Sequence, residues 1–451
     1  MVKPADVLSL LGDQLIPQAR TERTKLDDID AWLSKDNPVE MFQRMHTDDA
    51  EKKELSRLSY SPLLRLIVEE CAQQMVLGGV MSPGRETAAL WAPWERNGMP
   101  SRQGALWRAS IGYGLAYTVT MPGQVPGERG DRAAIRAYSP RDLYVVYGDV
   151  VEDEWPLYGL RTIGAGSAGT HYRLIDDEVV HYVARDDSGA LRYIEQRAHD
   201  VGVPPIVRWS NGMDLEGRTP GEVEKHKVVA HRYVKTTFDR LLIQHHNSWR
   251  VKTATGLEDP GSPEEQERQK ALLRHEDILT GGEGVAFGSL PETTLDGIIR
   301  AGDTDRDTLA ALAQIPVWTL NGGQLVNLAA DALSEARSAS RQKVDEKKRG
   351  MNRSIAQNLR IAAFIEGRQE DAEDYGITGQ WEDIESRSLS QAADALGKIA
   401  SQLKVPPALL LDMVPGLSKT QADEWRRYMR ENPSPEERMA DALERQAAGE
   451  I

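Results

Sequence analysis

A glycine-rich segment is the part of the chain that most resembles a chemical site. Gly164, Gly166 and Gly169 match the GxGxxG spacing of loops that bind dinucleotides. Such loops place phosphates at a helix N-terminus, so a strand must precede the glycines and a helix must follow them. Residues 170–175, which follow here, have the composition of a strand. We therefore predict a hairpin loop at residues 164–169 and no nucleotide site.

Other catalytic and metal-binding patterns are missing from the sequence. The GxxxxGKS/T loop that grips a nucleoside triphosphate is absent, and its nearest approach, Gly397-Lys398, continues with Ile399. The sequence has one cysteine and no HExxH pair. His245 and His246 are neighbours on a predicted helix and therefore point to different sides. We predict no catalytic residue, no cofactor and no metal, and hence a protein that is not an enzyme.

The composition is that of a folded protein made in a reducing compartment. The chain has 451 residues, which is long for a single core, so we expect several sub-domains. Cys71 is the single cysteine, so it cannot form an intrachain disulfide, and we expect it in the core. The most apolar stretch, residues 61–80, contains Arg65 and Glu69, and no signal peptide is visible. We expect synthesis in the cytosol and no membrane contact.

The acidic balance argues against a protein that grips DNA tightly. The chain has 70 Asp and Glu residues against 55 Lys and Arg residues, which gives a formal net charge of −15. Affinity for DNA comes largely from cations that neutralise phosphates, so a static DNA binder normally has a basic face. The balance suits a wall past which DNA slides, and it equally suits an ordinary acidic enzyme.

The first half of the sequence predicts helices and then strands. Helices are expected at residues 6–14, 25–34, 54–58 and 61–77, the last of them capped by Ser61 and ended by Gly78. Trp91, Trp94 and Trp107 have the spacing of helices packed on a core. Antiparallel strands are expected at residues 113–121, 133–138, 143–147, 158–163, 172–175, 179–183, 191–196 and 206–209.

The second half predicts long helices around an acidic, turn-rich excursion. Residues 222–252 have the periodicity of one helix, and residues 284–290 have the pattern of a strand. A shorter helix is expected at residues 303–313, with a start nearer 294 as the alternative. A glycine-rich loop at 319–324 precedes a helix at 332–366, which ends at Gly367 and can kink at Gly350. The mixed charges of that helix predict a solvated or subunit-contacting face.

The order of these features resembles the portal proteins of tailed bacteriophages, particularly the portal family of phages of Gram-positive and actinobacterial hosts. The resemblance covers nearly the whole chain and has three main parts. They are the β-rich stretch with residues 138–140, 156–161 and 203–211, the long helix 222–252 entering the acidic excursion, and residues 327–367 with their Ala332-Leu333-Ser334-Glu335-Ala336 start.

The resemblance implies an α+β phage portal fold with a β-rich wing, a helical stem, a small α/β clip, a long kinked helix and a helical crown. It divides the chain into N-terminal helices and wing at 1–220, first stem helix at 221–256, clip at 257–302, second stem helix at 303–318, tunnel loop at 319–333, long wing helix at 334–367, and crown with C-terminal region at 368–451. The tunnel loop is expected to line the DNA channel with Thr319, Leu320, Asn321, Gly322, Gly323 and Gln324.

The resemblance also implies a function and partners. It implies a homododecameric ring at one capsid vertex of the virion, assembled in the host cytoplasm, through which DNA is packaged and ejected. Expected partners are the major capsid protein and scaffold, the large terminase subunit, the head–tail connector or adaptor, and double-stranded DNA that passes without sequence specificity.

Two other classes of protein stay open at this point. A minor head protein or adaptor is another virion component, but such proteins are usually shorter and lack the stem–clip–stem order. A terminase-type enzyme requires a phosphate loop or a metal-binding carboxylate set, and neither is visible in the sequence.

Overall fold

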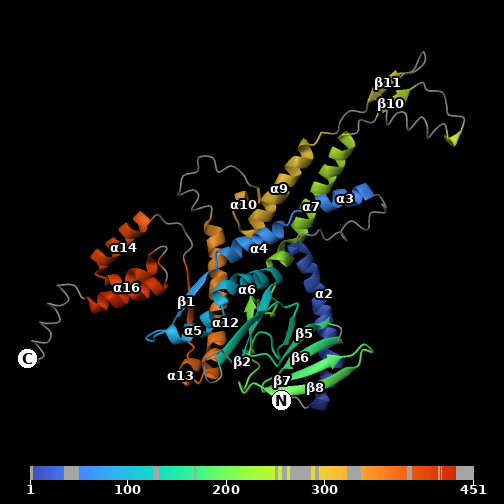
Figure 1. The fold of residues 1–451 in the computed structure, drawn as a ribbon. Coiled ribbons are helices and arrows are strands. Elements are labelled where there is room, and N and C mark those ends of the chain that lie inside the picture. Colours follow the sequence, from blue (N-terminus) through green and yellow to red (C-terminus); the bar gives the residue numbers. More distant parts are fainter. Residues whose placement is uncertain are drawn as a thin grey trace, which may run out of the picture. The chain divides into compact units, whose positions relative to one another are not determined.

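The computed structural model describes residues 4–34, 50–124, 132–166, 169–248, 252–255, 262–264, 286–289, 294–321, 337–382, 389–414, 417 and 419–432 (Figure 1). The chain divides into two compact units. Unit 1 comprises Met1–Asp27, Val68–Glu222 and Arg341–Ile451, and unit 2 comprises Asp28–Ile67 and Val223–Ser340. No helix among the described residues is both long and apolar enough to span a bilayer.

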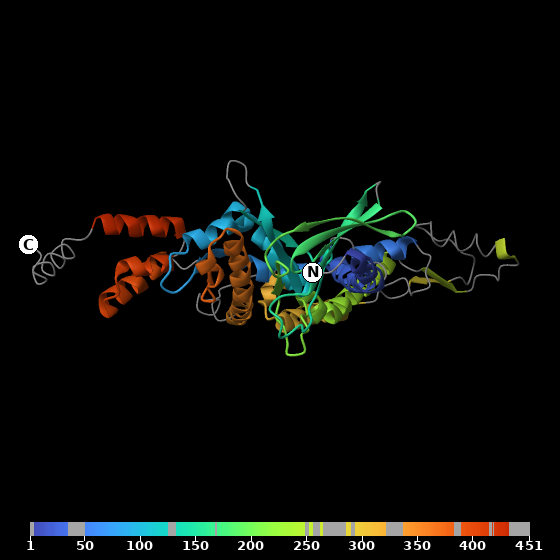
Figure 2. The same ribbon diagram turned by 90° about the horizontal axis from the view of Figure 1, so that it is seen from below.

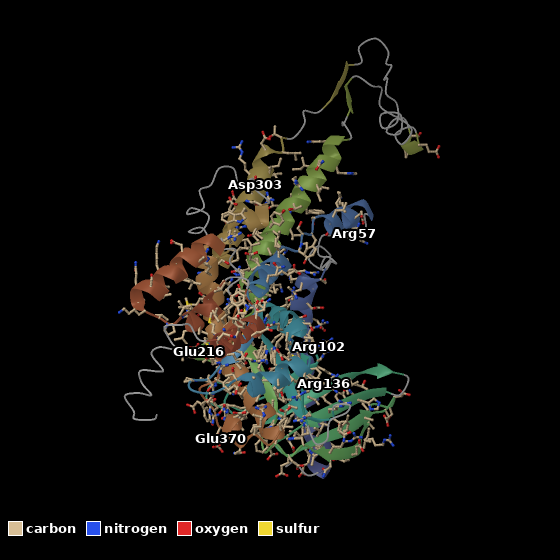
Figure 3. The ribbon with its side chains drawn as sticks, turned by 60° about the vertical axis from the view of Figure 1, so that its left-hand side comes forward. Arg57, Arg102, Arg136, Glu216, Asp303 and Glu370 are labelled. Carbon is tan, nitrogen blue, oxygen red and sulfur yellow. The ribbon has the colours of Figure 1, made fainter. Side chains whose placement is uncertain are left out.

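A three-stranded antiparallel sheet lies at the centre of unit 1 (Figure 2). Its strand order is β3 (Arg132–Tyr138), β2 (Leu115–Gly123) and β9 (Ile206–Ser210). Successive strand residues face opposite sides. Arg136 and Tyr138 therefore share one face of β3. The side chain of Arg136 is labelled in Figure 3. Ala133 and Ile135 share the other face and are buried.

Tryptophans fill the core beside this sheet, as the sequence predicts. The helices α5 (Ala88–Arg96) and α6 (Met99–Tyr113) supply Trp94 and Trp107, which are fully buried together with Trp209 of β9. The ring centroids of Trp107 and Trp209 lie 5.3 Å apart, and those of Trp94 and Trp209 lie 6.1 Å apart. Tilted and edge contacts of this kind add to the stabilisation that burial gives.

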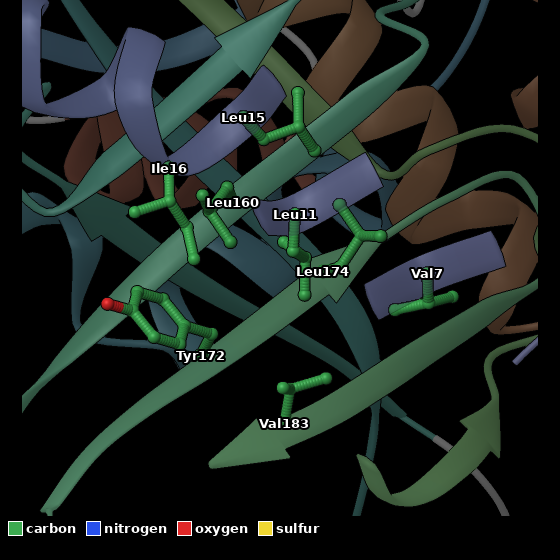
Figure 4. Close-up of a cluster of buried hydrophobic side chains, with 8 residues drawn as sticks. All are labelled: Val7, Leu11, Leu15, Ile16, Leu160, Tyr172, Leu174 and Val183. Atoms are coloured by element: carbon green, nitrogen blue, oxygen red, sulfur yellow. The ribbon is translucent and has the colours of Figure 1, made fainter. Parts of the chain in front are cut away.

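A five-stranded antiparallel sheet forms the second layer of unit 1. Its strands follow chain order: β4 (Leu143–Val146), β5 (Tyr158–Gly166), β6 (Gly169–Ile175), β7 (Val179–Arg185) and β8 (Leu191–Ala198). One face is packed against α1 (Pro4–Ser9), the π-helical turn η1 (Leu10–Leu15) and the start of α2 (Ile16–Leu33). Figure 4 shows this core, which consists of Val7, Leu11, Leu15, Ile16, Leu160, Tyr172, Leu174 and Val183.

The other face of the five-stranded sheet meets the three-stranded sheet over part of its area. Leu143, Ile175 and Val180 pack there with Tyr117 and Ile206. Each strand expected between residues 113 and 209 is present, and all the pairs are antiparallel, so these predictions are confirmed. The GxGxxG segment lies in the β5–β6 hairpin, where Gly166 pairs with Gly169, and a strand follows it.

The remaining elements of unit 1 correct one helix prediction. The helix expected at 61–77 is α4 (Leu63–Gln73), and residues 77–81 form strand β1 (Leu77–Met81) instead of a helix end. β1 pairs with β12 (Thr378–Trp381), a partner distant in sequence that local periodicity cannot reveal. The other elements are α12 (Ser338–Ile365), α13 (Gln369–Ala372), α14 (Leu389–Leu403), α15 (Pro407–Leu410), η3 (Leu411–Met413) and α16 (Lys419–Glu431).

Unit 2 contains the long helices expected to form the stem, together with shorter helices and a strand pair. They are α3 (Ala50–Leu58), α7 (Glu222–Ser248), α9 (Asp296–Ala313), α10 (Val317–Asn321) and the antiparallel pair β10 (Lys252–Thr255) and β11 (Ala286–Ser289). The short helix expected at 303–313 in fact begins at Asp296, which supports the alternative start. The helix predicted from 222 to 252 is wrong at its end, because α7 ends at Ser248 and residues 252–255 form strand β10.

Candidate functional site

Two backbone segments meet closely where α7 begins. Gly114 ends α6 with a φ of +98°, and a Cβ built on it would lie 1.8 Å from the carbonyl oxygen of Thr219. A Cβ on Gly221 would lie 2.2 Å from the carbonyl oxygen of Gly112. The backbone N–H of Asn211 donates to the Gly114 carbonyl at 2.8 Å. Only glycine permits this approach, because any side chain would overlap backbone atoms.

A buried ion cluster surrounds the first residue of α7. The Glu222 carboxylate accepts a hydrogen bond from Lys347 Nζ at 2.9 Å and one from Lys343 Nζ. Asn211 Nδ2 donates to the same carboxylate at 3.1 Å, and Asn211 Oδ1 accepts from Lys347. The side chains of Glu222, Lys347 and Lys343 are 1%, 5% and 9% exposed. The cluster therefore joins the end of β9, the start of α7 and the middle of α12.

Two buried ammonium groups, those of Lys343 and Lys347, contact the same Glu222 carboxylate. Burial lowers the pKa of Lys347, and the Glu222 carboxylate opposes that shift. Burial also raises the pKa of the nearby Cys71 thiol, which lies in the core as expected. Because an unpaired buried charge is costly, Glu222 is needed to keep both lysines inside. The mixed charges of α12 predict a solvated or subunit-contacting face, and for Lys343 and Lys347 that prediction is wrong.

A second buried polar network fixes α12 against the three-stranded sheet. Ser354 Oγ donates to the Arg208 carbonyl at 2.6 Å, and Asn358 Nδ2 donates to Thr118 Oγ1 at 2.6 Å. Trp209 Nε1 donates to the same hydroxyl at 2.9 Å. Buried polar groups that are hydrogen-bonded in this way specify one register of a helix on a sheet. They place α12 relative to β2 and β9.

Gly350, the expected kink, lies between these two networks in α12. The helix continues from Ser338 to Ile365 through Gly350 without interruption, and a Cβ on Gly350 would meet nothing within 4 Å. The helix ends as expected at Gly367, whose φ is +72°, and the Arg368 N–H bonds back to the Ala363 carbonyl at 2.9 Å. A kink at Gly350 stays a prediction.

A cavity of about 320 Å³ opens beside the ion cluster. Its lining includes Tyr147, Arg208, Lys347, Gly350 and Arg353. The Arg208 guanidinium stacks over the Tyr147 ring at 4.5 Å, and burial raises the pKa of Tyr147 to about 12. The lining offers no nucleophile activated by a base, and the described residues contain no group of acidic, histidine or cysteine side chains that could hold a metal. We find no acid–base chemistry here.

The pair of helices α7 and α9 in unit 2 is joined by one aspartate. Asp305 accepts from Arg232 Nε at 2.5 Å and from Thr236 Oγ1 at 2.9 Å, and its side chain is 9% exposed. Val234, Phe238 and Leu309 are buried along the same two helices. An apolar stripe with one charged link is the pattern of two helices fixed in register.

The predicted channel residues are only partly within the described chain. Thr319, Leu320 and Asn321 end helix α10 rather than form a loop, while Gly322, Gly323 and Gln324 lie outside the described residues. Pro316 was expected only to end the preceding helix, but proline also suits the start of a helix. Its carbonyl accepts a hydrogen bond from the Thr319 N–H at 3.0 Å, and α10 begins at the next residue. Asn321 Nδ2 donates to Asp307 of α9 at 2.7 Å.

Sequence reasoning missed Glu222, Asn211 and Gly114 as structural residues. One available signal was the four-residue spacing of Lys343 and Lys347, which places both on one helix face near the apolar Val344. That signal could not identify the partner, because Glu222 lies 121 residues from Lys343 in sequence.

Comparisons with known proteins identify a family. A family model described as "Phage portal protein, SPP1 Gp6-like" matches residues 13–433. The chain is similar to a chain of "Neck of empty GTA particle computed with C6 symmetry" over 82% of its own length and 94% of that chain, with 13% identity and a TM-score of 0.44. It is also similar to a chain of "Virion of native gene transfer agent (GTA) particle", over 80% and 95%, with 14% identity and a TM-score of 0.42. No curated protein matches the chain.

Proposed function

Because the chain belongs to the SPP1 Gp6-like family of phage portal proteins, we propose that it forms a dodecameric ring at one capsid vertex, through which DNA is packaged and ejected. The observation that carries this proposal is the extent of the family match, which spans residues 13–433 and so includes both units. We also propose that the chain is the portal protein of a phage of a Gram-positive or actinobacterial host, and that it assembles in the host cytoplasm.

We assign the parts of the ring subunit to the observed elements. The three-stranded and five-stranded sheets of unit 1 with α5 and α6 form the wing, and α7 and α9 form the stem. The segment between the stem helices, with its β10–β11 pair, forms the clip that docks the large terminase subunit and later the head–tail connector. We assign the tunnel loop to the segment that follows α10, the long wing helix to α12, and the crown to α14, α15 and α16.

We further propose that the ring is a passive conduit rather than an enzyme. The net charge of −15 suits a wall that DNA slides past without sequence-specific contact, because few phosphates can be neutralised. The one dinucleotide-like glycine segment is a β-hairpin, which cannot bring a helix N-terminus to a phosphate. The energy for packaging then comes from the terminase.

Assembly of capsids with and without this chain tests the proposed function. Capsid protein and scaffold should form shells in both cases, but only shells that contain the chain should take up DNA when terminase and ATP are added. DNA uptake of equal extent by shells that lack the chain would contradict the proposal.

Replacing Gly322 and Gly323 with alanine should slow packaging without preventing ring assembly. Two glycines give a loop access to backbone conformations that other residues resist, and a loop in the channel must change shape as DNA passes. DNA uptake per minute by reconstituted capsids is the measurement, and ring formation by the same protein is the control. DNA uptake at the wild-type rate would show that these glycines do not contribute to packaging.

A further inference from the structure

Two arginines face each other on the five-stranded sheet. Arg161 of β5 is directly paired with Arg173 of β6, and Arg173 is paired with Tyr182 of β7. Paired residues of neighbouring strands lie on the same face, with Cβ atoms about 4.5–5.5 Å apart. Both guanidinium groups therefore lie on the face opposite to the α1–η1 core, which is the face where Ile175 and Val180 meet the three-stranded sheet.

Tyrosine rings support both guanidinium groups. Arg161 stacks over the Tyr138 ring at 4.5 Å, and Arg173 stacks over the Tyr182 ring at 5.2 Å. The Nε atom of each arginine is buried and has no hydrogen-bond partner. Arg136, which is exposed, lies two residues from Tyr138 on the same face of β3 (Figure 3). The rings hold the guanidinium planes in place and leave their terminal N–H groups for another partner.

Neither arginine forms an ion pair within the part of the chain that the structure describes. A third arginine of the same sheet shows the contrast, since Arg197 pairs with Glu195 at 2.5 Å while it stacks on Tyr182. Like charges directly opposite each other destabilise a sheet, and half-buried donors without acceptors add to that cost. An arrangement that is costly in the isolated chain indicates a partner that supplies the missing negative charge.

We propose that Arg161 and Arg173 bind carboxylate side chains of a second copy of this chain. This proposal rests on the proposed function, because a ring places a copy of the chain against each copy through a heterologous interface. Each copy has a surplus of 15 acidic groups, so carboxylates are available on the neighbour. A planar guanidinium pairs with a carboxylate through two parallel hydrogen bonds. Double-stranded DNA is the other source of anionic acceptors, and its binding is measured in the test below as an outcome that overturns the proposal.

The test is the double variant Arg161→Gln/Arg173→Gln. Glutamine keeps a long polar side chain and removes the charge. The matched control is Arg197→Gln/Arg218→Gln, which removes two arginines that already pair with Glu195 and Asp214 of their own chain. Oligomer distributions are measured by mass photometry at equal protein concentration in low and high salt, together with the melting temperature and the binding of a fluorescent double-stranded DNA.

The proposal predicts at least a tenfold weaker ring assembly for Arg161→Gln/Arg173→Gln, with a melting temperature of the monomer that is unchanged or higher. The control variant should assemble like wild type. Rings that form equally well in wild type and the double variant overturn this inference alone. If the double variant forms intact rings but loses DNA binding, the arginines bind phosphate, and this result also overturns the inference. A wild-type chain that forms no ring even with scaffold and capsid protein contradicts the proposed function, and the inference falls with it.

Discussion

Replacing Glu222 with glutamine should lower the free energy of unfolding by about 3–5 kcal/mol, because it removes the carboxylate that two buried lysines contact. The two ammonium groups are 5% and 9% exposed, so water cannot replace the carboxylate without opening the start of α7. Urea titration followed by tryptophan fluorescence measures the change, since the buried Trp107 and Trp209 lie in the same unit.

The matched control for this variant is Lys343→Met, which keeps the buried pair of Lys347 and Glu222. Its cost should be smaller than that of Glu222→Gln, because the remaining buried ammonium group keeps its carboxylate. A Lys343→Met variant as unstable as Glu222→Gln would contradict the idea that the Glu222 carboxylate decides the stability of the cluster.

The effect of Glu222→Gln should also depend on pH. The pKa of Lys347 is already lowered from 10.5 in the folded chain, so the unfolded chain holds this proton to higher pH than the folded one. Lys347 therefore opposes folding at neutral pH, and this opposition fades as the pH rises through the folded pKa toward 10.5. Without Glu222 the folded pKa falls further. The stability gap between wild type and Glu222→Gln should thus narrow from pH 7 to pH 10, and a constant gap would contradict this account.

Replacing Gly114 with alanine should have a comparable cost, about 3–5 kcal/mol or a loss of soluble protein, because the new Cβ overlaps a carbonyl and the residue has a left-handed φ. The overlap is with the Thr219 oxygen at 1.8 Å, which no rotamer change can relieve. Soluble yield and the urea midpoint are the measurements. Gly221→Ala should behave in the same way, since its Cβ would lie 2.2 Å from the Gly112 oxygen.

Gly350→Ala is the control for these glycine variants. Its Cβ would meet nothing within 4 Å and it lies inside α12, so alanine should stabilise the chain by about 0.5–1 kcal/mol. If Gly114→Ala were as stable as wild type, the close contact of residues 112–114 with residues 219–221 would not exist in solution.

The strands were predictable because their evidence is local. Strand-forming residues, with turn residues between the runs, indicate each strand from 113 to 209. The β5–β6 hairpin is indicated because a strand pattern, rather than a helix pattern, follows the glycines. Strand β1 was not predictable in the same way. Gly78 and Gly79 indicate a helix end, and residues 77–81 form a strand by pairing with residues 378–381, which are distant in sequence.

The ion cluster shows why the candidate site could not be predicted in full. Lysines on a mixed-charge helix are usually solvated, and the shared helix face of Lys343 and Lys347 does not identify a buried partner. Their burial depends on Glu222 and Asn211, which come from other elements more than 100 residues away. The start of α9 was hidden for a different reason, because Gly297 and Gly302 weaken the helix signal at its first turns.

Electron microscopy of the purified chain, alone and with scaffold and capsid protein, tests the central claim most directly. A portal subunit should form closed rings with a central channel, and averaged end views should show their rotational symmetry. The account predicts such rings, with twelve subunits in capsid-bound assemblies. A chain that stays monomeric even when scaffold and capsid protein are present would contradict it.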